Sequence, residues 1–256
     1  NIIPPSKGEL ACSDEGVGRL KEPDEIFDYV NDYIQSSKEY KGIRFLVTAG
    51  PTREYIDPVR YITNRSSGKM GLSLANVIKR KGGTVSLVTG SIDCKDIHYD
   101  RIFNVETADE MLNLLKKEVK ESDILIMAAA VADFKPKEIS ERKIKKGKSF
   151  LLELVENPDI LKELSKEKDE SQVFVGFAAE SDDLIENAKK KIGEKNLDMI
   201  VLNDISRSDI GFDSNYNEVT LIYKNGRMKR VPKATKEKIA EEIISKAVEI
   251  YKSING

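Results

Sequence analysis

Hydrophobic residues follow two alternating patterns from residue 43 onward. Short apolar runs predict buried strands, and between them apolar residues recur three and four positions apart, as on one face of a helix. The expected strands are residues 43–47, 84–89, 123–127, 150–155, 172–178 and 197–202. The expected helices begin at residue 68 and cover 107–120, 182–195 and 236–252, with another starting at 157. This order predicts an α/β fold, a Rossmann-like and mostly parallel sheet flanked by helices.

Local residue choices predict several boundaries. Thr107 and Glu110 have the spacing of a capping box. Asn157 is expected to cap a helix that has Pro158 at its first position. Residues 218–223 and 227–231 flank Asn225-Gly226, which suits a type I′ turn and predicts a C-terminal β-hairpin extension.

The first 40 residues differ from the rest. They are rich in Gly and Pro, begin without methionine, and contain one short amphipathic stretch from Pro23 to Ile34. We expect residues 1–40 to be the end of an upstream domain and residues 41–256 to be a separate domain.

Composition excludes several classes of function. The 42 basic and 44 acidic residues give a net charge of -2, which shows no bias toward nucleic acid or anionic membranes. Cys12 and Cys94 form no CxxC motif, which favours a reducing cytoplasm, and the apolar run from Ile124 to Ala132 is too short to span a membrane. The single histidine, His98, lies in a polar loop and is interpreted as structural.

The segment from Gly50 to Gly71 is the most informative part of the chain. It joins a strand to a helix that starts near Ser66-Ser67-Gly68, and the loop before it contains arginines and Asn64. Because a helix start offers unpaired N–H groups and a positive dipole end, we expect an anion such as phosphate or carboxylate to bind there.

Three further segments follow predicted strands, where ligands bind in open parallel sheets. They are Ala128 to Asp133, Phe177 to Glu180, and Asn203-Asp204. The alanines would let a base or ribose approach the backbone, or they would serve tight packing. Asp133 would accept hydrogen bonds from ribose hydroxyls or hold a divalent ion. The alternative is that it is an exposed loop carboxylate without such a role.

Two lysine groups also have two interpretations. Lys143-Ile-Lys-Lys146 is a solvated surface run or a flap that closes over a triphosphate. Lys191 and Lys195 share a helix face, where they grip phosphates or lie in solvent. Neither the dinucleotide-binding motif GxGxxG nor the P-loop motif GxxxxGK[ST] is present. The residues alone therefore indicate an enzyme that acts on a nucleotide or phosphate ester, and they do not identify its reaction.

Ordered motifs resemble the phosphopantothenoylcysteine synthetase family of coenzyme A biosynthesis, also called phosphopantothenate–cysteine ligase. The motifs span residues 43–225 and are Ala49–Arg53, Ile56–Ile62, Asn64–Gly71, Ala128–Asp133, Lys143–Lys146, Asn157–Ile160, Gly176–Glu180 and Lys195–Asp198. The resemblance implies that 4′-phosphopantothenate is joined to L-cysteine through an acyl-cytidylate made from CTP. It also implies Mg²⁺ and a homodimer whose second subunit helps to enclose the site.

The resemblance also assigns residue roles. Asn64 would bind the acyl-cytidylate, and Arg60 and Lys143 would help it to form or react. The residues implied at the nucleotide are Met127, Ala128, Ala129, Asp133, Lys143, Pro158, Asp159, Ile160, Leu161, Phe177, Lys191 and Lys195. Those implied at the phosphate or substrate are Gly50, Ser66, Ser67, Gly68 and Gly71.

The N-terminal segment resembles the end of the fused decarboxylase domain of this family, with Cys12 as its proton donor. FMN would belong to that domain, so we expect no decarboxylation by this chain alone. Two rival classes stay open, a nicotinamide-dependent oxidoreductase and a non-catalytic nucleotide-binding module. The sequence does not decide between CTP and ATP, and it does not identify the residues that bind cysteine.

Overall fold

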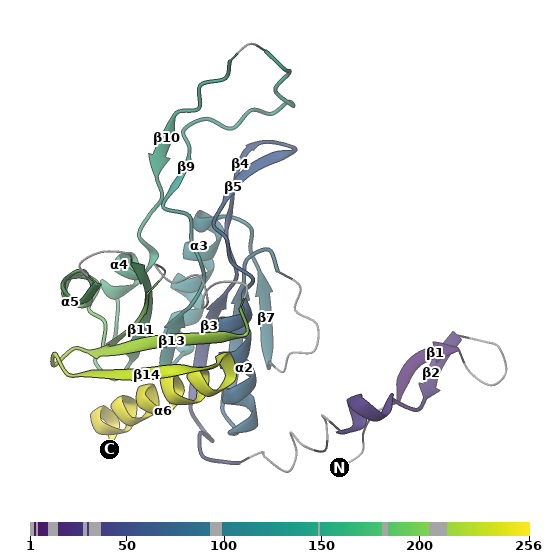
Figure 1. The fold of residues 1–256 in the computed structure, drawn as a ribbon, viewed down its shortest axis with the longest axis vertical. Coiled ribbons are helices and arrows are strands. Elements are labelled where there is room, and N and C mark those ends of the chain that lie inside the picture. Colours follow the sequence, from purple (N-terminus) through teal and green to yellow (C-terminus); the bar gives the residue numbers. More distant parts are fainter. Residues whose placement is uncertain are drawn as a thin grey trace.

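The computed structural model describes residues 3, 5–9, 15–27, 30, 37–92, 99–147, 149–180, 184–204 and 214–256. Its centre is an eight-stranded sheet in the order β14-β13-β12-β11-β8-β3-β6-β7 (Figure 1). The strands β12, β11, β8, β3, β6 and β7 run parallel, and β13 and β14 add an antiparallel hairpin at one edge. The bounds are β3 Arg44–Ala49, β6 Thr84–Thr89, β7 Arg101–Asn104, β8 Ile124–Met127, β11 Val173–Glu180, β12 Met199–Asp204, β13 Tyr216–Tyr223 and β14 Met228–Thr235. The predicted α/β fold with a C-terminal hairpin is confirmed.

Helices cover both faces of this sheet. On one face α2 (Lys69–Arg80) and α6 (Lys236–Asn255) pack side by side over Val47, Val175 and Val201. On the other face α3 (Ala108–Glu118), which continues as the short helix η1 (Val119–Glu121), lies with α4 (Ile160–Ser165) and α5 (Leu184–Glu194). Alternate residues of each strand therefore enter two separate apolar layers, as expected for a parallel sheet buried on both sides.

Two hairpin arms project from the carboxyl end of the sheet (Figure 1). The short arm is β4 (Arg53–Asp57) paired with β5 (Arg60–Thr63), within a segment that the sequence pattern describes only as a loop. The long arm consists of β9 (Phe134–Pro136), β10 (Leu154–Glu156) and the described residues between them. The strand expected at residues 150–155 is therefore wrong in extent, because only its last two residues join the ladder of β10.

Two predicted boundaries need correction. Asp159, and not Asn157, caps α4 by accepting a hydrogen bond from the Lys162 amide, while the Asn157 side chain bonds the Ala132 carbonyl oxygen instead. The β13–β14 turn is not type I′, since among the described non-glycine residues only Asn196 has positive φ. It is a three-residue loop that ends at the left-handed Gly226, a form that also suits the right-handed twist of a hairpin.

The capping box of α3 is confirmed in part. Thr107 accepts from the Glu110 amide, but the Glu110 carboxylate accepts from the amide of Glu106 rather than of Thr107. In the N-terminal segment, β1 (Ser6–Glu9) and β2 (Glu15–Arg19) form their own two-stranded sheet, and residues 23–27 are helical. The rest of the stretch expected to be helical up to Ile34 lies, apart from residue 30, outside the described residues, as do Cys12, Cys94 and His98.

Candidate functional site

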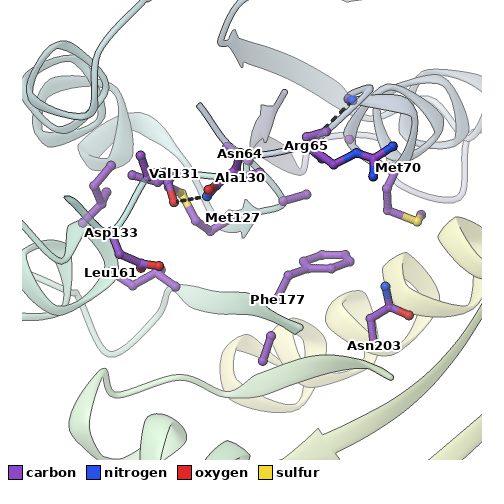
Figure 2. A pocket seen from close by; sticks show the side chains of 18 of the residues that line it. Asn64, Arg65, Met70, Met127, Ala130, Val131, Asp133, Leu161, Phe177 and Asn203 are labelled. Carbon is purple, nitrogen blue, oxygen red and sulfur yellow. Dashed lines mark hydrogen bonds between the residues drawn. The ribbon is translucent and has the colours of Figure 1, made fainter. Parts of the chain in front are cut away.

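A cavity of about 690 Å³ opens at the carboxyl end of the central strands (Figure 2). Segments that follow four strands line it. They are the loop after β5 with the start of α2, the residues after β8, Phe177 and Ala178 of β11, and Asn203 of β12. The strand ends that the sequence pattern selects therefore do meet at one edge of the sheet.

Asn64 lies at the centre of this cavity over the segment from Ala128 to Asp133. Its side-chain amide donates a hydrogen bond of 2.9 Å to the Val131 carbonyl oxygen, which Figure 2 marks with a dashed line. The amide is thus held beside the loop after β8, and its carboxamide group faces the same space as Met127 and Phe177.

Two buried threonines fix the loop after β8. The hydroxyl of Thr48 accepts from the Ala129 amide at 2.9 Å, and that of Thr52 accepts from the Ala132 amide at 3.0 Å. The Ala130 amide donates to the carbonyl oxygen of Gly50 at 2.9 Å. The alanines therefore line the cavity on a rigid backbone, so both interpretations of their small size, close packing and close approach of a ligand, agree with the geometry.

The predicted helix start is also at the cavity. Helix α2 begins at Lys69, after Gly68, whose φ of 71° is in the left-handed region, and no side chain caps it. Ser66, Ser67, Gly68 and Gly71 all line the cavity. Gly71 has a second role, because a Cβ there would lie 2.5 Å from the Ala49 Cβ, so glycine lets α2 approach β3 closely. The N-terminal amides of α2 thus face the space where an anion is expected.

The expected nucleotide residues gather at the α4 and α5 end of the cavity. The residues of this set that line it are Met127, Ala128, Ala129, Asp133, Pro158, Asp159, Ile160, Leu161, Phe177, Lys191 and Lys195. Lys195 forms an ion pair of 2.8 Å with Asp159, the residue that caps α4. Asp133 is exposed, so its carboxylate is accessible from the cavity.

Three expected site residues do not line the cavity. Gly50 lies behind it, where its carbonyl oxygen supports the loop after β8. Arg60 lies on the short arm and Lys143 on the long arm, and both side chains are at least partly exposed. Within one chain, then, the structure brings Asn64 to the cavity but not its two expected catalytic partners.

Asp57 joins the two arms that carry Arg60 and Lys143. Its fully buried carboxylate accepts from the Arg60 guanidinium, from the amides of Val59 and Arg60 at 2.9 Å, and from the Ile144 amide at 3.1 Å. Burial raises the pKa of this carboxyl, but Arg60 and the backbone amides outweigh burial and hold the pKa at about 2. Arg60 also donates to the Ile144 carbonyl oxygen at 2.7 Å, so it is fixed next to Lys143.

Several lining residues are not predicted from the sequence. Asn157 was assigned to a helix cap, Lys236 was assigned only to a helix, and Asn217 lay just before the strand expected at residues 218–223. The lining residues that lie outside the segments selected from the sequence and have no implied role are Phe134, Glu156, Asn157, Asn217 and Lys236.

Two further features are absent from the described residues. They contain no group of three or more His, Cys, Asp or Glu side chains placed to hold a metal ion. None of the helices in this part of the chain is both long enough and apolar enough to cross a membrane.

Known proteins are similar to this chain in sequence and fold. The family described as DNA/pantothenate metabolism flavoprotein C-terminal domain matches residues 40–251. The coenzyme A biosynthesis bifunctional protein CoaBC of Haemophilus influenzae is 38% identical over 251 residues, which are 98% of this chain and 62% of that relative. A cysteine/cysteine sulfinic acid decarboxylase from an unknown prokaryotic organism is 41% identical over 252 residues, 96% of this chain and 70% of that protein. The crystal structure of the C-terminal domain of a CoaBC protein superimposes with a TM-score of 0.73 at 38% identity, covering 85% of this chain and all of that one.

Proposed function

Because this chain belongs to the DNA/pantothenate metabolism flavoprotein C-terminal domain family, we propose that it ligates 4′-phosphopantothenate to L-cysteine in coenzyme A biosynthesis, using CTP. The observation that carries the proposal is the cavity, because the motifs around Asn64, Asp133 and Lys195 converge on it from separate strands. The name of the Haemophilus relative supports the pathway. This chain spans 62% of that relative. FMN-dependent decarboxylation is therefore proposed only for a longer parent protein that also contains the decarboxylase domain, and not for this chain.

The reaction has two steps. In the first, a carboxylate oxygen of 4′-phosphopantothenate attacks the α-phosphorus of CTP, and pyrophosphate leaves. In the second, the amine of cysteine attacks the activated carbonyl carbon and loses a proton, and CMP leaves with the former carboxylate oxygen. Both reactants are anions, so the protein must hold them together against their repulsion.

The cavity offers groups for each task. Lys191 on α5 and Lys195, directly after the end of α5, would bind the phosphates of CTP, and the Asp159–Lys195 ion pair would open as they do so. Asn64, at the centre, would hydrogen-bond the acyl phosphate group as charge develops on it. The loop after β8, whose backbone is held by hydrogen bonds to Thr48, Gly50 and Thr52, would provide a rigid surface for the base and ribose.

Mg²⁺ fits this donor set. It is usually bound in enzymes by one or two carboxylates together with substrate phosphates, and Asp133 gives the cavity an accessible carboxylate on the nucleotide side. Asp133 would hold the ion with the phosphates of CTP, and the ion would neutralise charge at the phosphate under attack.

A homodimer accounts for the positions of Arg60 and Lys143. The arms that carry them have exposed apolar side chains, at Val59, Tyr61, Phe134, Ile139, Phe150, Leu151, Leu154 and Val155. Exposed apolar groups gathered on one feature are typical of a protein interface. We propose that the arms of one copy pack against a second copy and bring Arg60 and Lys143 to its cavity.

Pyrophosphate release tests the proposal. Purified protein with Mg²⁺ and 4′-phosphopantothenate is assayed with CTP or ATP, with and without L-cysteine. The proposal expects release with CTP, and CMP formation only when cysteine is added. Absence of release from folded protein would leave a nucleotide-binding module, and a cofactor-dependent absorbance change would reveal the nicotinamide alternative.

A separate assay tests whether this chain has a decarboxylase activity, because one relative is named a cysteine/cysteine sulfinic acid decarboxylase. Carbon dioxide release from cysteine, or from 4′-phosphopantothenoylcysteine, is measured with added FMN. We expect none from this chain, and release would show that the decarboxylase activity resides here.

A further inference from the structure

One oxygen of the Asp57 carboxylate shapes a turn, and the other joins the two arms. Oδ1 accepts from the amides of Val59 and Arg60 at 2.9 Å, which is the pattern of an Asx turn. Oδ2 accepts from Nε of the Arg60 side chain at 3.0 Å and from the Ile144 amide on the long arm at 3.1 Å. The turn needs only the first oxygen. The second oxygen of this fully buried carboxylate therefore serves contacts beyond the turn.

The hydrogen bonds of Arg60 leave one edge of its guanidinium group open. Nε and Nη2 donate to Asp57, and Nη2 also donates to the Ile144 carbonyl oxygen at 2.7 Å. Nη1 has no acceptor among the residues that the structure describes, and the side chain is 46% exposed. Because the Nε–Nη2 edge fixes the guanidinium plane, the N–H groups of Nη1 face away from Asp57 and can donate to an anion outside the arm.

The segment that carries Lys143 is attached to the short arm at two points (Figure 1). The Ser140 amide donates to the Ile56 carbonyl oxygen at 3.0 Å. Ile144 uses both of its backbone groups, since its amide donates to Asp57 and its carbonyl oxygen accepts from the guanidinium group. Lys143 lies between these points, is exposed, and has no hydrogen bond or ion pair with any described residue. Its backbone is therefore fixed relative to the guanidinium group, while its ammonium group is available to a ligand.

We propose that Asp57 is a positioning residue that holds Arg60 and Lys143 as one unit, which the arms present to the nucleotide in the cavity of the second copy. This inference rests on the proposed function and its homodimer. Two cations at a fixed separation can stabilise the negative charge that shifts to the leaving pyrophosphate without rearranging during the reaction. Asp57 touches no substrate and acts only through the two cations.

Asp57→Asn tests this role because it separates the two oxygens. Asparagine keeps the oxygen that the turn needs and replaces Oδ2, which only accepts, with an NH₂ group that faces other donors. We expect kcat for pyrophosphate release to fall by about 30- to 100-fold, as for a misplaced catalytic group, and the KM for CTP to stay within about threefold. Glu138→Gln removes an exposed carboxylate from the long arm, and this matched control should change neither value. An unchanged kcat in Asp57→Asn would overturn the inference.

Combining substitutions shows whether Asp57 acts through Arg60. In an Arg60→Gln background, Asp57→Asn should lower kcat by less than about tenfold, because only Lys143 is left to position. The same factor in both backgrounds would mean that Asp57 affects the reaction independently of Arg60 and would contradict the inference.

A mixed dimer tests whether the unit acts on the second copy. Co-expression with two affinity tags isolates a dimer of one Asp57→Asn subunit and one Asn64→Ala subunit. The cavity of the first subunit keeps Asn64 and receives the intact arms of the second, so about half of the unmodified activity is expected from its one complete site. Activity no higher than that of the two parent variants would place the unit at its own cavity. Failure of Asp57→Asn to dimerise would reduce Asp57 to an interface residue. Either result would overturn the inference.

Hydrogen exchange separates this inference from the proposed function, because it needs no turnover. In Asp57→Asn the Ile144 amide should exchange at least about tenfold faster, while the Val59 amide, whose acceptor remains, should keep its rate. Unchanged exchange at Ile144, or an equal loss of protection at both amides, would contradict the positioning role even if the protein releases no pyrophosphate. If Asp57→Asn does not fold, Asp57→Ser, whose hydroxyl can accept in the turn, provides the same test.

Discussion

The side-chain amide of Asn64 donates to the Val131 carbonyl oxygen at 2.9 Å and so joins the loop that precedes α2 to the loop that follows β8. The loop after β8 is held in turn by the hydroxyls of Thr48 and Thr52, which accept from the amides of Ala129 and Ala132. The central residue of the cavity is therefore positioned before any ligand binds. Such preorganisation is what allows a hydrogen-bond donor to act on a transition state without further rearrangement.

Replacing Asn64 tests its proposed place at the acyl phosphate. We expect Asn64→Ala to lower kcat for pyrophosphate release by about 100-fold, the usual cost of losing one preorganised donor. The KM for CTP should change by less than about threefold, because the phosphates contact other residues. Steady-state assays measure both values. An unchanged kcat would remove Asn64 from the reacting centre.

Lys191 on α5 and Lys195, directly after its last residue, should act on the nucleotide. Removing one charge-assisted hydrogen bond to a phosphate costs about 1.5–3 kcal/mol, so Lys195→Ala should raise the KM for CTP by about 10- to 100-fold. Lys190 lies on α5, five residues before Lys195, is exposed, and pairs with Glu194 at 3.8 Å, so Lys190→Ala is the control. Equal increases in the KM for CTP in the two variants would mean that Lys195 does not contact the phosphates and contributes only to the overall positive charge near them.

Asp57 should make the contact between the two arms depend on pH. Its pKa of about 2 lies below the ordinary 3.8, so the carboxylate stabilises the folded arms fully above pH 4 and less as the pH falls toward 2. The amide resonances of Val59 and Ile144 should titrate with a midpoint near 2 in an NMR pH series. In Asp57→Asn these shifts should be absent, and their persistence would assign them to another group.

The arms should control association. Leu151 is 93% exposed, and Leu151→Asp should weaken self-association by at least about tenfold, as expected for a charge placed in an apolar interface. Sedimentation velocity over a range of concentrations measures this change. Ile254→Asp, at an exposed apolar position on α6, is the control. A protein that is monomeric before substitution would contradict the dimer.

Two glycines in helices should respond in opposite ways to alanine. Gly71→Ala would place a methyl group 2.5 Å from the Ala49 Cβ, so we expect a loss of about 1–3 kcal/mol in unfolding free energy. A methyl group added at Gly193 on α5 would meet no atom of another element within 4 Å, so alanine there should stabilise by about 0.5–1 kcal/mol. Denaturant unfolding compares the two. A neutral Gly71→Ala would show that α2 can move away from β3.

Sequence periodicity was enough to predict the sheet and the edge where the cavity lies. Buried runs such as those that became β3, β8 and β11 are decided by local hydrophobicity, and ligand sites follow the carboxyl ends of parallel strands. The short arm was not predicted, because β4 and β5 pair only with each other and have little apolar periodicity. The roles of Asn157 and Asn217 in the cavity wall were missed because a polar residue at a helix cap or beside a strand cannot be distinguished from a lining residue until the fold brings distant segments together.

The most direct test of the proposed reaction follows an oxygen atom. 4′-Phosphopantothenate labelled with ¹⁸O in its carboxylate is allowed to react with CTP and L-cysteine, and the released CMP is analysed by mass spectrometry. An acyl-cytidylate requires one labelled oxygen to appear in CMP. Unlabelled CMP formed together with the ligated product would show that the carboxylate is not activated by the α-phosphate and would contradict the proposed reaction.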